Sequence, residues 1–358
     1  MIKKKVLIIG VSDYLLPVIK ILKKKKIEYY QVGAYQSNYR KSKKIFKFDY
    51  SKKKKILVFA KKIKATHIIP DCNDTAYLTA SYIANKLNMP GYEPLKISNL
   101  LLNKKLFYNF CNKNNLSIPK FYFCKKNTLL NSVVKFPILK KPQNSYSGIG
   151  IIKINDKNDL KKINNKTKFL YSEFKKGKLY SHSCFIDNNE IQNSYFVREF
   201  CINYPYAVDF SKTEKLKPSR LQKRLITEIN KIIKLLNIKS GLVHTQFIVN
   251  KSKFYLIEVT RRLPGDFYGD LIKLSYRNND YYLNFVNNFI SENLYFSKKI
   301  KFIKCIRKNF FKNESKNFNK ILKNYKISKI KKIYLFNNNL LKFDLNNKKR
   351  YILLATYK

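Results

Sequence analysis

The chain has 358 residues, of which 45% are hydrophobic, and its 75 lysine and arginine residues against 22 acidic ones give a formal net charge of +53. This length is enough for two or three domains with large cores, and no stretch approaches the roughly 20 continuous apolar residues that span a bilayer. Six scattered cysteines without a C-x-x-C pair argue against a disulfide framework and a zinc site, so we expect a cytoplasmic protein without a membrane segment.

The first 92 residues alternate between buried-strand and helix patterns. The expected elements are Val6–Gly10 (strand), Leu15–Leu22 (helix), Glu28–Ala34 (strand), Ile56–Ile63 (helix), Thr66–Pro70 (strand) and Asp74–Leu87 (helix). We expect Asp74 to cap the last helix and Pro90-Gly91 to end it. This alternation is typical of a small parallel α/β domain. Gly10 stands alone, without a G-x-G-x-x-G pattern, so a dinucleotide cofactor is not supported.

The rest of the chain is richer in strands. Leu95–Asn115 carries two helical patterns that we expect to separate at Ser98 and Asn99, and a long helix is expected at about Ser219–Leu236. The strands expected around that helix are Phe121–Cys124, Phe136–Lys141, Gly150–Ile154, Phe169–Phe174, Leu179–Ile186, Val243–Val249 and Phe254–Thr260. From about Lys299 the pattern predicts one helix and short strands at Phe302–Ile306, Ile333–Phe336, Leu340–Phe343 and Tyr351–Ala355.

One of these strands ends in a lysine and leads into a Ser/Gly-rich turn. The lysine is Lys141. The turn contains Ser145, Ser147, Gly148 and Gly150. Glycine lets the backbone approach an oxyanion closely, and serine hydroxyls and backbone N–H groups donate to it. The pattern therefore indicates a phosphate-covering loop with Lys141 as a point-charge partner; the alternative is an ordinary β-hairpin with a Gly-rich turn.

A second polar group lies on two alternating strands near residue 250. Glu258 and Thr260 share one strand face, and Arg262 extends their row. His244 and Gln246 share a face of the preceding strand, so pairing of the two strands would gather all five side chains on one surface. A carboxylate among oxygen ligands suits Mg²⁺, and a neighbouring arginine suits a transferring phosphoryl group. The alternative is an exposed Glu–Arg pair of little energetic value.

Taken in order, these motifs resemble the ATP-grasp superfamily, especially the branch of the carbamoyl-phosphate synthetase large chain and biotin carboxylase. The resemblance covers about residues 1–295. It is carried by Lys140-Lys141-Pro142 with the S-x-S-G-x-G loop, Ser172-Glu173-Phe174-x-x-Gly177, Glu258-x-Thr260-x-Arg262-x-x-Gly265, Ile69-Pro70-x-x-Asn73-Asp74 and Pro90-Gly91. It implies a mixed α/β and α+β fold: a parallel α/β, Rossmann-like pre-ATP-grasp domain (1–92), an ATP-grasp fold of two α+β subdomains (93–298, with a lid at about 120–186) and a small C-terminal β-rich segment (299–358).

The resemblance also implies a role for each matching residue. The residues that would bind ATP are Lys104, Lys141, Ser145, Ser147, Gly148, Gly150, Ser172, Glu173 and Phe174. Those that would hold Mg²⁺ are Glu258, Gln246 and Thr260. Both lysines would reach the phosphates, and the backbone from Ser172 to Phe174 would hold adenine. Glu258 and Arg262 would form the catalytic pair, with Arg262 facing the γ-phosphoryl group and the acyl phosphate.

Three positions depart from the family pattern. Gln246 stands where a second metal-binding glutamate is usual, Thr260 where asparagine is common, and Lys178 where a glutamate often appears. A neutral amide compensates the charge of Mg²⁺ less well than a carboxylate does. The number of metal ions therefore stays open, and a non-catalytic nucleotide-binding regulator remains an alternative.

The function that the resemblance implies is that of an ADP-forming ligase. Such an enzyme would use ATP and Mg²⁺ to activate a small carboxylate as an acyl phosphate and would couple it to an amine. Dimers are frequent in this group, so a homodimer stays open. Substrate contacts would be expected in the stretch that contains Arg198, Asp209, Arg220 and Arg224, although no motif fixes them.

The positive charge leaves a nucleic-acid-binding protein as a third class. Lysine and arginine side chains neutralise phosphates, and that is the basis of this alternative. The lysines, however, are spread along the whole chain, and only nine residues are arginine. Lysine, asparagine, isoleucine, tyrosine and phenylalanine, all encoded by A/T-rich codons, are abundant together. We therefore attribute the charge to composition and expect no specific nucleic-acid partner.

Overall fold

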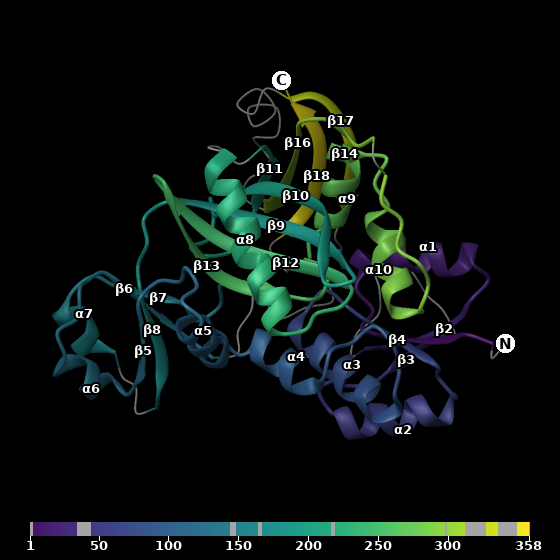
Figure 1. The fold of residues 1–358 in the computed structure, drawn as a ribbon, viewed down its shortest axis with the longest axis horizontal. Helices are drawn as coiled ribbons and strands as arrows, with labels where there is room; N and C mark the ends of the chain where they lie inside the picture. The colour runs from purple at the N-terminus through teal and green to yellow at the C-terminus, as the bar shows by residue number, and fades with distance from the viewer. Residues whose placement is uncertain are drawn as a thin grey trace.

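The structure is a computed structural model, and it describes residues 3–33, 44–143, 148–163, 167–215, 219–297, 299–311, 327–335 and 349–357. It contains an N-terminal parallel sheet, a small antiparallel sheet that projects to one side, and a large antiparallel sheet between them (Figure 1). The strand expected at Leu340–Phe343 lies outside the described residues, as do Ser145 and Ser147.

The N-terminal sheet has four parallel strands in the order β3-β2-β1-β4. The strands are β1 (Lys5–Ile9), β2 (Glu28–Gly33), β3 (Ile45–Lys47) and β4 (His67–Pro70). The helices of this part are α1 (Leu16–Lys24), α2 (Lys53–Lys62) and α3 (Asp74–Leu87), with a short 3-10 turn at Asp13–Leu15. The expected parallel α/β arrangement is confirmed. One detail is corrected: the oxygen that caps α3 belongs to Asn73, which accepts from the N–H of Ala76, and Asp74 is the first helical residue.

The small sheet has four antiparallel strands in the order β5-β8-β6-β7. The strands are β5 (Phe121–Cys124), β6 (Ile138–Lys141), β7 (Ile152–Ile154) and β8 (Phe169–Glu173), and the helices α6 (Lys126–Leu130) and α7 (Lys157–Lys162) pack with them. This sheet ends at β8. It lies within the stretch 120–186 that we expect for the lid, and the bounds of that lid stay a prediction.

The large sheet has eight antiparallel strands, including three from the C-terminal segment. In spatial order they are β13 (Lys253–Thr260), β12 (Gly241–Asn250), β9 (Lys178–Asp187), β10 (Glu190–Phe200), β11 (Phe210–Thr213), β16 (Cys305–Phe311), β18 (Lys349–Tyr357) and β17 (Ile327–Leu335). The expected strand at Phe302–Ile306 is divided in two, because β15 (Lys301–Phe302) pairs with β14 (Tyr276–Arg277) instead. The C-terminal strands thus continue one sheet rather than adding a layer.

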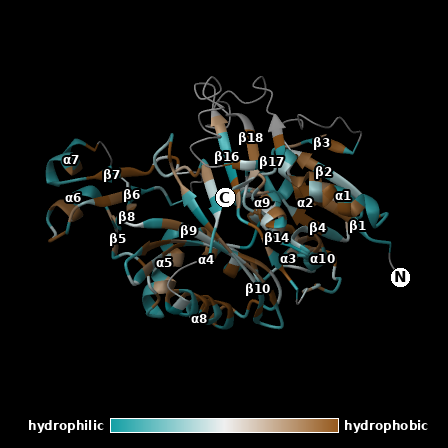
Figure 2. Cartoon of the chain, turned by 90° about the horizontal axis from the view of Figure 1, so that it is seen from above, coloured by the Kyte–Doolittle hydropathy of each residue, from teal (hydrophilic) through white to brown (hydrophobic). Residues whose placement is uncertain are grey.

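Helices cover the large sheet on both sides. The longest is α8 (Ser219–Leu235), which is amphipathic and lies across β9 and β10 (Figures 1 and 2). Its buried residues are Leu221, Leu225, Ile229, Ile232 and Ile233, and their spacing of three or four positions places them on one face. The helices α9 (Tyr268–Ser275) and α10 (Tyr281–Phe289) share a hydrophobic core with β1 and α1. Within the described ranges, none of the helices has the length and hydropathy needed to cross a membrane.

The connection between the N-terminal part and the rest runs through α4 (Leu95–Leu102) and α5 (Lys104–Lys113). The break between them falls at Asn103, not at Ser98 and Asn99 as expected. Asn103 has an extended backbone, and its side-chain oxygen accepts from the N–H of Leu106. An N-cap must stand immediately before the helix that it caps, so this asparagine determines where α5 begins.

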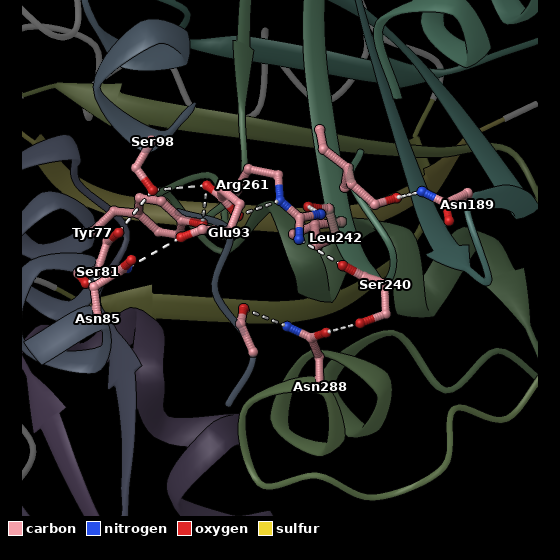
Figure 3. Close-up of polar contacts among 12 residues, drawn as sticks. Tyr77, Ser81, Asn85, Glu93, Ser98, Asn189, Ser240, Leu242, Arg261 and Asn288 are labelled. Carbon is pink, nitrogen blue, oxygen red and sulfur yellow. Dashed lines mark hydrogen bonds and ion pairs between the residues drawn. The ribbon is translucent and has the colours of Figure 1, made fainter. Parts of the chain in front are cut away.

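A buried ion pair fastens the two parts together (Figure 3). The Nε of Arg261 lies 3.3 Å from Oε2 of Glu93, and both side chains are less than 5% exposed. The guanidinium also donates to the carbonyl oxygens of Leu242 and Ser240. Tyr77 and Ser98 donate their hydroxyls to the other oxygen of Glu93. This network fixes the end of β13, and with it the residue that follows Arg261.

Candidate active site

The face of β12 and β13 carries the polar residues that the alternation predicted. In the strand register His244 lies opposite Thr260, and Gln246 lies opposite Glu258. Directly opposed residues of antiparallel strands point to the same side of the sheet. A bulge follows immediately, between Gln246 and Phe247. Glu258, Thr260 and Gln246 are therefore grouped as expected, whereas their roles stay predictions.

Two lysines from other elements join this group. Lys141 is the last residue of β6 and only 5% exposed, and Lys104 is the first residue of α5. Burial lowers the pKa of Lys141 to about 8, and the negative charge of Glu258 opposes this shift. Burial likewise lowers the pKa of Lys104, against the influence of Glu258 and Asp74. Both ammonium groups thus lie within electrostatic range of one carboxylate, although the three residues are far apart in sequence.

Arg262 and Asp74 complete the charged cluster. The Nε of Arg262 donates to Oδ1 of Asp74 over 2.6 Å, and Nη1 donates to the carbonyl of Leu263. Burial raises the pKa of the Glu258 carboxyl, as does the nearby Asp74, while Lys104, Arg262 and Lys141 lower it. Asp74 lies in the first turn of α3, so the N-terminal part of the molecule orients an arginine of the large sheet. The sequence indicates Asp74 as a possible helix cap and as part of a pre-ATP-grasp motif, but it gives no sign of the pairing with Arg262.

The oxygen atoms on this face fit a magnesium ion. Glu258 offers a carboxylate and Gln246 an amide oxygen, and the buried Oγ1 of Thr260 has no hydrogen-bond partner among the described residues. Mg²⁺ takes oxygen ligands and is often held by one or two carboxylates together with waters and substrate phosphates. In the part of the chain that the structure describes, no three His, Cys, Asp or Glu side chains form a metal-binding group. A metal on this face would therefore depend on the amide and the hydroxyl as well.

The described part of the glycine loop has backbone conformations that favour glycine. Gly148 and Gly150 both have positive φ values, 72° and 75°. A Cβ on Gly148 would lie 2.5 Å from the carbonyl oxygen of Tyr206, so no other residue fits there without displacement. The strands on either side form a hairpin in which Lys140 lies opposite Ile152. The β-hairpin that the sequence offered as the alternative is thus present. Phosphate binding by the loop stays a prediction.

The expected adenine segment is only partly available for a ligand. Ser172 is completely buried between β5 and β6, and within the described part of the chain its Oγ has no hydrogen-bond partner. The N–H groups of Glu173 and Phe174 already donate, to the carbonyls of Lys120 and Pro137 respectively. These two N–H groups are therefore not donors for a base, and contacts with adenine would have to use other groups of the segment.

Four residues that the sequence did not indicate hold the loop after Arg262. Asp266 accepts from the hydroxyl of Tyr14 at Oδ1 (2.8 Å) and from Asn309 at Oδ2 (2.7 Å). Arg307 donates to the carbonyls of Gly265 and Asp266. The backbone of Asp266 is left-handed, with φ 55°, a conformation that surrounding contacts must maintain in a non-glycine residue. Only the rarity of arginine could have drawn attention to Arg307, because its partners are about 40 positions away.

The four residues expected near the substrate do not gather at this face. Arg198 and Glu199 are consecutive residues of β10. Nη1 of Arg198 lies 3.6 Å from Oε1 of Glu214, with which it forms an ion pair. Asp209 organises its own loop by accepting from the N–H groups of Ile202 and Asn203. Neighbouring residues of a strand point to opposite faces, so the orientation of Glu199 toward Gln246 directs Arg198 away. Arg220 and Arg224 lie in the first two turns of α8, and Arg224 donates to the carbonyl of Ser252 in the turn between β12 and β13.

His182 and His244 form hydrogen bonds inside the sheet. His244 contacts the hydroxyl of Ser183 at 2.8 Å, and His182 that of Ser194 at 3.0 Å. Burial lowers the pKa of each imidazole to about 3. Both rings are therefore neutral at physiological pH and serve the structure as hydrogen-bonding groups.

Comparison with known proteins assigns this architecture. Residues 101–266 match the protein family described as "ATP-grasp domain". Residues 101–266 form an ATP-grasp domain. No curated protein matches the chain significantly in sequence.

Solved structures have the same ATP-grasp fold over almost the whole chain. Phosphoribosylglycinamide synthetase from Anaerococcus prevotii is 18% identical, with a TM-score of 0.76, and the match covers 99% of this chain and 94% of that one. L-amino acid ligase from Bacillus licheniformis is 15% identical, with a TM-score of 0.75 and coverages of 99% and 93%.

A third ATP-grasp structure was solved with a nucleotide. It is the biotin carboxylase domain dimer of the 2-oxoglutarate carboxylase of Hydrogenobacter thermophilus, in complex with MgADP, ADP and bicarbonate. It is 14% identical, with a TM-score of 0.72 and coverages of 99% and 86%. At these identities the similarity establishes the fold, which the sequence motifs had predicted.

Proposed function

We propose that the chain is an ATP- and Mg²⁺-dependent carboxylate–amine ligase that forms ADP and a C–N bond. The observation that carries this proposal is the convergence of Lys104, Lys141, Glu258 and Arg262. They come from α5, β6, β13 and the loop after β13, yet the charges of Lys104, Lys141 and Arg262 all act on Glu258. Three cations beside the two carboxylates of Glu258 and Asp74 leave an excess of positive charge, which suits a polyphosphate with a divalent cation better than it suits a structural ion pair.

The chemistry requires two anions to meet. A substrate carboxylate oxygen attacks the γ-phosphorus of ATP, the bond to the bridging oxygen of ADP breaks, and an acyl phosphate results. Lys104 and Lys141 would neutralise the phosphates, and Arg262 would face the transferring group with its planar fork. The bond from Nε to Asp74 holds that fork in place before the substrate arrives. An amine then attacks the acyl carbon and releases phosphate.

Magnesium would be held by Glu258 with Gln246 and Thr260, and when bound it would supply positive charge next to the phosphates. The buried Thr260 hydroxyl without a partner and the carboxylate of Glu258 support this assignment. The glycine loop at Gly148 and Gly150 would close over the phosphates and exclude water from the acyl phosphate.

The substrates are small molecules in this proposal. One similar structure belongs to an L-amino acid ligase and another to phosphoribosylglycinamide synthetase. These names support an amino acid or a sugar-linked amine or acid as substrate. We place the enzyme in the cytoplasm, where ATP is available and its six free cysteines stay reduced. A homodimer is part of the proposal, and light scattering would test it.

The decisive experiment measures ADP release from ATP in the presence of pools of amino acids and small carboxylic acids. We expect sustained ADP formation only when one carboxylate and one amine are both present, because the carboxylate alone permits at most one acyl phosphate per active site. Mass spectrometry should detect the amide that the two substrates form. Glu258→Gln keeps the shape but removes the charge, so it should lower turnover roughly 100-fold or more while ADP affinity changes only a few-fold. Equal turnover by this variant would contradict the proposal.

The alternative is a nucleotide-binding regulator without turnover. The neutral Gln246 in the metal group favours it, because the site then has fewer carboxylates. The same assay distinguishes the two functions. ATP binding that is never followed by substrate-dependent ADP release would identify a regulator.

A further inference from the structure

Gln246 has a specific hydrogen-bond partner that lies two strands away. Its Nε2 donates to Oε2 of Glu199 over 2.9 Å, across β9, which separates β12 from β10. Oε1 of Glu199 accepts from the hydroxyl of Ser181 over 2.9 Å. Glu199 is 4% exposed, so both of its carboxylate oxygens are engaged inside the protein.

This bond determines which atom of the amide faces the metal group. A carboxylate can only accept a hydrogen bond, so the NH₂ end of Gln246 must be the end that faces Glu199. The carbonyl oxygen Oε1 is then the remaining polar atom, on a residue that lies opposite Glu258 in the register. The NH₂ end could not bind a cation, whereas the oxygen can.

A salt bridge does not hold Glu199 in this position. Among the described residues, no ion pair within 4.0 Å joins its carboxylate to a lysine or arginine. Arg307 nevertheless acts on it electrostatically, and Glu258 acts in the opposite sense. A buried charge costs free energy unless it is both hydrogen-bonded and paired with an opposite charge, and among the described residues Glu199 has only the hydrogen bonds. Its presence beside the metal group therefore requires a reason.

We infer that Glu199 is a positioning residue, which fixes the amide of Gln246 with its oxygen toward Glu258 and so makes it a ligand for the divalent cation. This inference rests on the proposed function. It explains how the site can do without the usual second carboxylate ligand. The carboxylate of Glu199 would not contact the metal itself but would orient the amide of Gln246 that does. Outer partners of this kind commonly change metal affinity 10–100-fold when they are removed.

The test is a titration of Mn²⁺ into protein saturated with ADP, followed by electron paramagnetic resonance of the free ion. Glu199→Gln loses the fixed orientation, because either end of one amide can pair with the other amide. Glu199→Asp keeps the charge but withdraws the carboxylate by one methylene. We expect both variants to bind Mn²⁺ roughly 10-fold or more weakly. The matched control is Glu190→Gln, an exposed carboxylate at the start of the same strand, and it should bind as the wild type does.

A double exchange tests the same idea without a change in net charge. Glu199→Gln with Gln246→Glu keeps one carboxylate, one amide and the hydrogen bond between them, with the carboxylate now on the metal side. We expect Mn²⁺ affinity to return to within a few-fold of the wild type or to exceed it. This variant also keeps the test available if Glu199→Gln alone does not fold, which circular dichroism would reveal.

The possible failures are distinguishable. Unchanged affinity in Glu199→Gln would overturn the inference, and so would a loss in Glu199→Gln without one in Glu199→Asp, because charge alone would then explain it. A double exchange that folds but does not recover would also overturn it. If the wild type with ADP bound no Mn²⁺, the proposed function would fail first, and the inference with it.

Discussion

Lys141 is the residue whose ionisation we expect to affect nucleotide binding most directly. Its ammonium group lies 3.1 Å from the hydroxyl of Tyr108 and is buried at the end of β6. Burial lowers its pKa to about 8, so the side chain is charged at pH 7 and loses its proton as the pH rises past 8. Because a phosphate needs the charged form, ATP binding above that pH must take up a proton.

We therefore predict that ATP affinity falls as pH rises from 7 to 9, with a limiting slope of about tenfold per pH unit. Lys141→Ala should bind ATP weakly at every pH, since the charge-assisted contact is lost. Lys141→Arg should reduce the slope, because a guanidinium does not deprotonate in this range. Isothermal calorimetry at several pH values measures all three. A wild type with constant affinity up to pH 9 would contradict this role.

The geometry of Arg262 matters as much as its charge. We predict that Arg262→Lys lowers turnover roughly 100-fold, because a point charge cannot reproduce a planar fork that contacts both Asp74 and a phosphoryl group. ADP affinity should change only a few-fold. Arg224→Lys is the control, since its guanidinium makes an exposed hydrogen bond to the carbonyl of Ser252 in the turn between β12 and β13. Steady-state rates of ADP release compare the two, and similar rates would remove Arg262 from the chemistry.

At the scale of elements, β16 supports the loop that carries Arg262. Asn309 of this strand donates to Asp266, and the loop backbone there is left-handed at both Asp266 and Phe267. Such a backbone persists only where neighbours hold it, and β16 supplies two of those neighbours.

We predict that Asn309→Ala lowers turnover several-fold with little change in ADP affinity, and lowers the free energy of unfolding by about 1–3 kcal/mol. The physical reason is that Oδ2 of Asp266 loses the amide donor of Asn309. Ser328→Ala removes an exposed hydroxyl pair with Thr356 on the neighbouring C-terminal strands and serves as the control. Urea unfolding and the ADP-release assay measure the two effects. Equal losses in both variants would indicate general destabilisation of the C-terminal strands.

At the scale of the whole molecule, the Arg261–Glu93 pair joins the N-terminal part to the large sheet. We predict that Glu93→Gln costs about 3–5 kcal/mol of unfolding free energy, because it leaves a buried guanidinium without its counter-charge. Lys4→Met breaks an ion pair with Glu292 whose two side chains are about 30% exposed, and it should cost less than about 1 kcal/mol. Urea denaturation compares them. Costs of similar size would show that burial is not what makes the first pair important.

The net charge of +53 also belongs to the whole molecule. Lysines spread over the chain supply counterion release without reading bases, so we predict weak, sequence-independent nucleic-acid binding that fades near an ionic strength of about 150 mM. Fluorescence anisotropy with several DNA and RNA sequences measures this. A tight complex with one sequence at that salt concentration would favour the nucleic-acid class instead.

The sequence by itself determined most elements and the local groups. Alternation placed Glu258 with Thr260 and His244 with Gln246, because the period of a strand is a property of neighbouring residues. It also located β6 with Lys141 at its end and the parallel N-terminal sheet. The sequence patterns did not locate the break between α4 and α5, because a single side chain, that of Asn103, determines where α5 begins.

The tertiary structure alone decided which distant residues meet. Asp74 and Arg262 are 188 positions apart, and Gln246 and Glu199 are 47 apart, so no local pattern could pair them. The same holds for the C-terminal strands, which joined the large sheet and brought Arg307 and Asn309 to Asp266. Strand order depends on hydrogen bonds between segments and on the burial of whole faces. Both free-energy contributions depend on residues from the entire chain, so a sequence motif of a few residues does not determine them.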